Sequence, residues 1–79
     1  MPDKNAIRLD ECHQDQTCTI VALTGDLETK LHLVNLGFHT NSHIKVLLVR
    51  GDSYILTVDG SRFAVDKKIA HFIKVHPLS

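Results

Sequence analysis

The sequence predicts a mainly-β fold, a small barrel of five short antiparallel strands with one α-helix inserted after the first strand. Short apolar runs rich in β-branched residues alternate with turn signals along the chain. One stretch instead repeats its apolar residues with the helical period. The chain has 79 residues, which corresponds to one domain. Short strands in such a small domain tend to close on themselves, because closure removes exposed sheet edges.

The first strand is expected at residues 17–23 (TCTIVAL), a short β-branched run that ends at Thr24-Gly25.

A helix should follow directly. Asp26 has the features of an N-cap, and Gly37 is a natural residue to end the helix. Leu27, Leu31 and Val34 follow at i, i+4 and i+7, so they occupy one helical face. We expect this face to pack into the core.

The rest of the chain reads as strands joined by tight turns. Asp59-Gly60 predicts a two-residue hairpin, because a type I′ turn needs two residues that tolerate positive φ. The four further strands are expected at residues 44–50, 54–58, 62–65 and 72–75, with one helical turn at 66–71. This order describes an SH3-like barrel.

The barrel domain is predicted at residues 9–76, after a flexible N-terminal tail at residues 1–8. Its core should contain apolar residues from the helix and from all five strands: Ile20, Leu31, Val46, Leu56, Val58, Phe63, Val65 and Ile73.

Composition excludes several classes of function. Nine basic residues balance nine acidic ones, whereas proteins that grip nucleic acid usually carry a basic excess. No apolar run approaches the ~20 residues that cross a bilayer. The first ten residues contain no apolar stretch of signal-peptide length. We therefore expect a soluble, cytoplasmic protein that does not insert into the membrane.

Cys12 and Cys18 lie six positions apart, which is not the spacing of a paired-cysteine zinc site. In a reducing cytoplasm they are expected to be free thiols.

Several segments follow one another in an order that is typical of one family. They are a Leu-containing start at 9–12 (LDEC), Leu36-Gly37-Phe38 after the helix, Ile44-Lys45-Val46, and the closing 60–65 (GSRFAV) and 73–75 (IKV). In this order the chain resembles FeoA, the ferrous iron transport protein A family. The resemblance implies a small cytoplasmic accessory protein that binds and modulates the FeoB-type transporter of bacterial ferrous iron uptake. It also implies association with the inner membrane through that partner.

Two positions depart from the family pattern. Thr40-Asn41 stands where the family usually has Pro-x-Gly or Pro-Gly, and Asp15 stands where it usually has glycine. Asn tolerates the left-handed conformation better than most residues, so the turn after the helix is expected to persist.

We predict a partner-binding surface at the end of the helix and in the loop that follows. Leu33 and Phe38 would form an exposed apolar edge, beside the polar residues His39 and Asn41. No nucleophile elbow, phosphate loop or zinc-protease motif is present, so we expect no enzymatic activity and no required cofactor.

Histidines suggest an alternative function. His39 and His43 lie four positions apart and are the candidate ligands for weak transition-metal binding. Two ligands in a loop do not complete a tetrahedral site, so solvated histidines are the favoured interpretation. The alternatives to the accessory role are a small metal-binding or metal-sensing protein and a generic barrel that recognises an extended or Pro-rich segment. A homo-oligomer is also compatible with the sequence.

Overall fold

The structure is a computed structural model that describes residues 6–78. Its elements in chain order are β1 (Ile7–Arg8), the 3-10 helix η1 (Leu9–Glu11), β2 (Thr17–Leu23), α1 (Leu27–Leu36), β3 (His43–Arg50), β4 (Ser53–Val58), β5 (Ser61–Asp66), α2 (Lys67–His71) and β6 (Ile73–Pro77). Neither α1 nor any other described helix has the length and apolar character needed to cross a bilayer.

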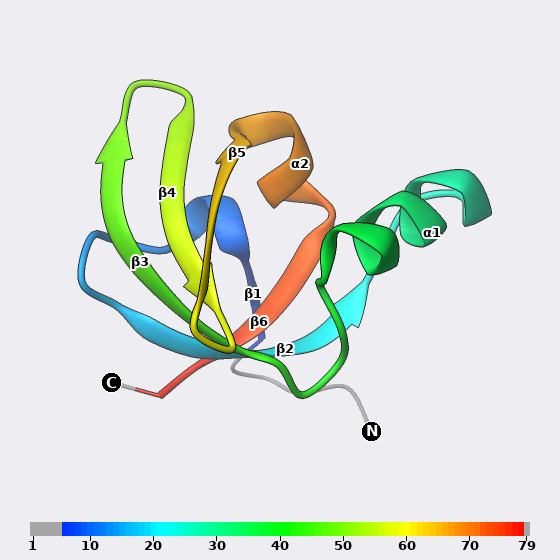
Figure 1. The fold of residues 1–79 in the computed structure, drawn as a ribbon, viewed down its shortest axis with the longest axis horizontal. Coiled ribbons are helices and arrows are strands. Elements are labelled where there is room, and N and C mark those ends of the chain that lie inside the picture. The colour runs from blue at the N-terminus through cyan, green and yellow to red at the C-terminus, as the bar shows by residue number, and fades with distance from the viewer. Residues whose placement is uncertain (1–5, 79) are drawn as a thin grey trace.

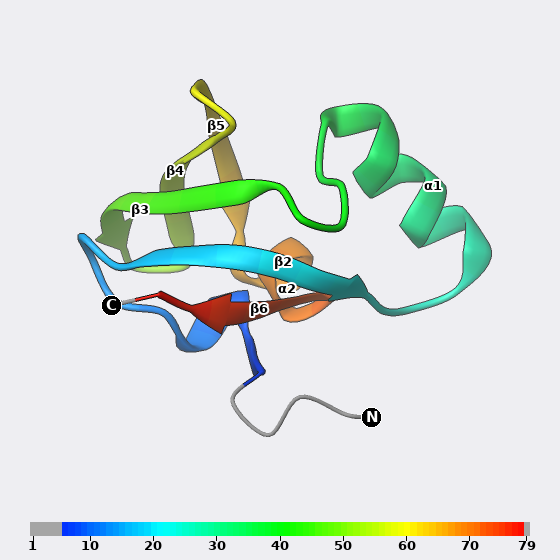
Figure 2. The same cartoon turned by 90° about the horizontal axis from the view of Figure 1, so that it is seen from below.

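Six antiparallel strands form one curved sheet in the order β1-β6-β2-β3-β4-β5 (Figures 1 and 2). The SH3-like architecture is confirmed, but the expected number of five strands is wrong. The two outer strands, β1 and β5, do not pair with each other, so the sheet is open. The short helix α2 contacts both β5 and η1, and it therefore bridges the two sides of the opening.

The additional strand comes from the segment predicted to be a tail. Ile7 and Arg8 pair with Val75 and Lys74 of β6, so the predicted tail is wrong at its last two residues. A strand of two residues is too short to show an alternating pattern, which is why the sequence did not indicate it. Residues 1–5 of the predicted tail lie outside the described residues.

The tight turns have the backbone that the sequence predicted. Asp59 and Gly60 both have positive φ, 51° and 91°, as the type I′ hairpin requires. Asn41 also has positive φ, 74°, so the turn after the helix persists without the family's usual glycine. Asp15, the other departure from the family pattern, has a φ of 70°.

The core lies inside the curved sheet. Most of the predicted core residues are buried, namely Ile20, Val46, Leu56, Val58, Val65 and Ile73. Phe63 is partly buried and packs against this cluster. The prediction for Leu31 is wrong, because its side chain is 54% exposed. Leu9 of η1 is also fully buried. The sequence did not predict this residue as part of the core.

Candidate functional site

Helix α1 begins and ends at defined caps. The Asp26 side chain accepts a hydrogen bond of 2.8 Å from the backbone N–H of Thr29, which satisfies a free donor of the first turn. Gly37 ends the helix in the left-handed conformation, and its N–H donates to the carbonyls of Leu33 and Val34. The helix is therefore a complete unit with its own end signals.

The N-terminal end of α1 is tied to the start of β6. The backbone N–H and the hydroxyl of Thr24 both donate to the carbonyl of Phe72, at 2.7 and 3.1 Å. Gly25 has a φ of 99°, and a Cβ there would lie 3.1 Å from the Phe72 ring. Only glycine combines this backbone with such a close approach.

The C-terminal end of α1 is held by aromatic packing. Leu33 and Phe38 are fully buried, and the Phe38 ring lies 5.4 Å from the Phe63 ring between centroids. Between these two attachments, α1 extends beside the barrel, beyond the end of β2 (Figure 1).

Helix α1 turns to solvent the side that was predicted to pack into the core, and it buries the side that was predicted to be exposed. The predicted exposed edge at Leu33 and Phe38 is wrong, because both side chains are buried. Leu27, Leu31 and Val34 were expected in the core, but they are 72%, 54% and 39% exposed. We call these three residues the apolar face of α1.

The physical reason is that α1 carries apolar residues on more than one side. Leu27, Leu31 and Val34 form one stripe, whereas Leu33 and Leu36 lie outside it. Periodicity identifies the stripe but does not say which side meets the barrel. Phe38, which is fully buried directly after the helix, packs against the partly buried Phe63, and we infer that this contact sets the side of α1 that meets the barrel.

An open groove of about 620 Å³ runs between α1 and the α2 region. It is lined by residues of both elements: Asp26, Glu28, Thr29, Leu31, His32, Asn35, Lys68, Ile69 and Phe72. Leu31 belongs both to the lining of this groove and to the apolar face of α1. Asp26 and Glu28 belong to the α1 side of the groove and Lys68 belongs to α2, so its apolar residues have charges of both signs beside them. This groove was not predicted from the sequence.

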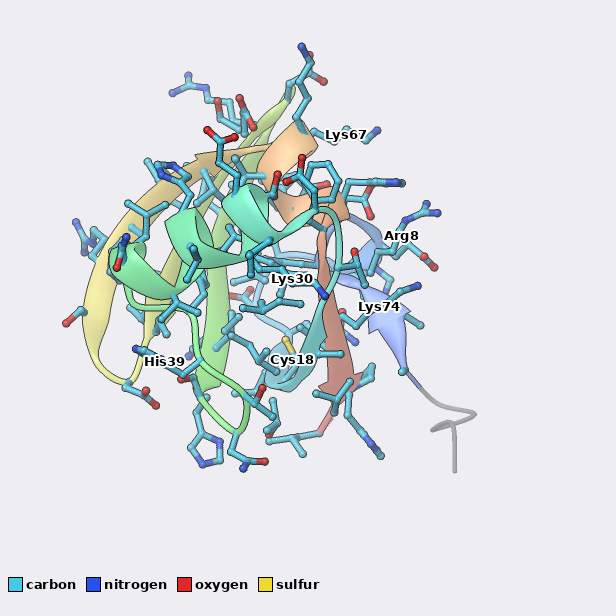
Figure 3. The ribbon with its side chains drawn as sticks, turned by 90° about the vertical axis from the view of Figure 1, so that its right-hand side faces the viewer. Arg8, Cys18, Lys30, His39, Lys67 and Lys74 are labelled. Atoms are coloured by element: carbon cyan, nitrogen blue, oxygen red, sulfur yellow. The ribbon has the colours of Figure 1, made fainter. Side chains whose placement is uncertain are left out.

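The loop after α1 is exposed but fixed. His39 and Asn41, the two predicted polar contact residues, are both exposed. The N–H of Asn41 donates to the carbonyl of Ile20 at 2.7 Å, and the N–H of Ile20 donates back to Ser42 at 2.9 Å. These bonds tie the loop to β2. Figure 3 shows His39 on the same side of the molecule as α1.

Asp59 anchors the start of β3 beside this loop. Its carboxylate accepts a 3.0 Å hydrogen bond from the backbone N–H of His43, and this bond lowers the pKa of Asp59. The candidate metal ligands His39 and His43 are both exposed. Among residues 6–78, no group of three or more His, Cys, Asp or Glu side chains is placed to hold a metal ion. The structure thus adds no third ligand to this pair.

A family model for the FeoA domain matches residues 7–77, nearly the whole chain. The chain belongs to the FeoA family. This family is linked to iron uptake. No curated protein sequence matches the chain closely enough to count as a relative.

Solved structures of FeoA proteins share the fold. One, an iron uptake regulatory protein (FeoA), is 27% identical with a TM-score of 0.86, over 92% of this chain and 99% of that one. A FeoA-like protein from Clostridium acetobutylicum is 18% identical with a TM-score of 0.89, over 98% and 92% of the two chains.

The same fold occurs within larger proteins. A manganese-dependent transcriptional repressor in complex with manganese is 22% identical, with a TM-score of 0.88. The match covers 98% of this chain but only 39% of the repressor chain. This likeness therefore concerns one part of the repressor.

Proposed function

We propose that this FeoA-family protein binds the cytoplasmic part of a FeoB-type ferrous iron transporter and modulates its activity, as a binding module without catalysis. The family supports the link to ferrous iron. The observation that carries the binding role is the apolar face of α1. Its three aliphatic side chains face solvent on a helix attached to the barrel through its ends.

An apolar face of this kind is unusual on a folded domain. Single exposed apolar residues are common, but adjacent ones on one helix commonly mark a protein interface. Leu27 and Leu31 each gain from burial, at about 25 cal/mol for each Å² removed from water. A partner that covers the face would supply this burial.

The groove beside the face indicates the chemistry of the partner segment. Leu31, Ile69 and Phe72 are the apolar residues that line the groove, so an aliphatic side chain from the partner is the expected occupant. The surrounding Asp26, Glu28 and Lys68 provide polar contacts at the rim. Such interfaces concentrate their binding energy in a few central apolar contacts.

Complementation of ferrous iron uptake tests this function. Cells that lack the native protein should take up ferrous iron slowly, and the wild-type chain should restore the rate. Leu31→Glu should not restore it, because the charge would be buried against the partner. Leu48→Glu is the matched control, since Leu48 is an exposed leucine (40%) on β3, away from the groove.

Two results would contradict the proposal. Uptake at the wild-type rate in the deletion strain would remove the link to ferrous iron transport. Full rescue by a folded Leu31→Glu variant would instead remove the docking face while leaving the family role intact. Circular dichroism of each purified variant confirms that the barrel is folded.

A further inference from the structure

The two cysteines meet inside the barrel, although the sequence separates them by a loop. Cys12 caps the end of η1, and Cys18 lies in β2. Both are buried free thiols, and their Sγ atoms are 4.0 Å apart. Figure 3 shows the sulfur of Cys18 directed into the interior between the strands.

The two thiols differ in chemistry. The two thiols share a hydrogen bond, in which either sulfur can be the donor, and this bond lowers the pKa of Cys12. The same bond, together with burial, raises the pKa of Cys18. Cys12 is also the thiol nearer to solvent, at 6% exposure against 0%. A small oxidant would therefore meet Cys12 first, and Cys12 is the thiol of the pair that loses its proton more readily.

The backbone allows one side of the pair to move. Cys18 lies in the middle of the sheet, opposite Ile44 of β3 and Pro77 of β6. Cys12 lies at the end of a three-residue helix, followed by exposed residues 13–15. A disulfide needs the sulfurs about 2.05 Å apart, so they must approach by roughly 2 Å. Because β2 is paired with a strand on each side and η1 is not part of the sheet, we expect Cys12 to make this approach.

We propose that Cys12 and Cys18 form a redox pair that hydrogen peroxide converts into an intramolecular disulfide. The Cys12 sulfur attacks one peroxide oxygen, the O–O bond breaks, and Cys12 becomes a sulfenic acid, while the other oxygen leaves as hydroxide and takes up the proton of the Cys12 thiol to form water. The Cys18 sulfur then attacks the Cys12 sulfur, the S–O bond breaks, and the hydroxide leaves with the Cys18 proton as a second water. Two thiols are oxidised and one peroxide is reduced. This reaction is independent of the partner proposed above.

The protein contains its own reporter of the movement. Tyr54 is the only tyrosine, and the chain has no tryptophan. Its hydroxyl donates a 2.9 Å hydrogen bond to the carbonyl of Asp10 in η1, two residues before Cys12. When Cys12 moves toward Cys18, η1 should move with it and change the fluorescence of Tyr54.

The test treats the full chain with hydrogen peroxide and measures intact mass, free thiols in denaturant and Tyr54 fluorescence. We expect the wild type to lose two hydrogen atoms, to form no disulfide between chains, and to show residues 12 and 18 linked in a peptide map. The fluorescence change should accompany this linkage, and dithiothreitol should reverse both.

Single variants separate the two roles. Cys18→Ala should stop at the Cys12 sulfenic acid, which dimedone traps. Cys12→Ala should keep its remaining buried thiol under the same treatment. Should either variant fail to fold by circular dichroism, the wild-type peptide map decides the question alone. Two unmodified thiols after treatment, a disulfide only between chains, or oxidation of Cys12→Ala at the wild-type rate would overturn the proposal.

Discussion

Leu31 and Leu33 lie two positions apart on α1 and have opposite environments. Leu33 is fully buried, whereas Leu31 is half exposed. We predict that Leu33→Ala lowers the free energy of unfolding by about 2–5 kcal/mol, because it leaves a cavity under the helix. Leu31→Ala should change it by no more than about 0.5 kcal/mol, as for most surface substitutions. Urea denaturation followed by circular dichroism measures both; a larger cost for Leu31→Ala would mean that α1 presents its other side to the barrel.

Asp10 is an acidic residue held in a cluster of charges, with its side chain only 6% exposed. Burial disfavours its ionised form, but the hydrogen bond from Arg8 at 2.9 Å and the charges of Arg8 and His71 outweigh burial. The pKa of Asp10 is therefore below its ordinary value.

This shift predicts a pH dependence of stability. Because the folded pKa is lowered, the stabilisation is fully present above the unfolded pKa of about 3.9 and is lost as pH falls through the folded pKa. Asp10→Asn should lower the thermal midpoint at neutral pH and flatten its dependence on pH in the acid range. Thermal unfolding across the acid range compares variant with wild type. Parallel profiles, displaced by a constant amount, would show that the charge of Asp10 does not contribute.

The connection between β2 and α1 depends on one glycine. Gly25 combines positive φ with close approach to Phe72, whereas Gly51 has a φ of 58° and a Cβ added there would meet no atom within 4 Å. We predict that Gly51→Ala lowers the free energy of unfolding by about 1 kcal/mol, because it strains the backbone and creates no steric conflict. Gly25→Ala should cost more, because it adds a steric conflict with the ring. Equal losses in chemical denaturation would contradict a close contact between this turn and the Phe72 ring.

The five longer strands and the limits of α1 could be predicted from the sequence because their signals are local. A short apolar run marks β4, and the Asp26 cap and Gly37 mark the ends of α1. The orientation of α1 could not be predicted in the same way. It depends on packing between Phe38 and Phe63, which are far apart in the chain, and nothing in the helix itself reveals that contact.

The candidate site arises only in the folded molecule. Its groove brings α1 together with Lys68, Ile69 and Phe72, which follow more than thirty residues later in the chain. The sequence predicted the helix itself, and the loop residues His39 and Asn41 are exposed as a contact surface would require. It selected the wrong apolar residues of that helix, because an exposed leucine and a buried one have the same local pattern.

At the scale of the molecule, the surface that we propose for the partner is formed by the apolar face of α1 and the adjoining groove. The affinity of the partner for this surface should depend on Leu27 and Leu31. Substitution of an exposed leucine elsewhere should not change that affinity. Leu27→Glu and Leu31→Glu should both remain folded, because their side chains already face water. This distinguishes them from changes at Leu33, which would act through unfolding.

The most direct measurement is a calorimetric titration of the purified chain against the soluble cytoplasmic domain of a FeoB-type transporter. We expect the wild type and Leu48→Glu to bind with the same affinity. Leu31→Glu should bind at least about tenfold more weakly, as substitution of a central apolar contact usually does. Equal affinities for Leu31→Glu, Leu48→Glu and the wild type would show that the apolar face of α1 is not the docking surface.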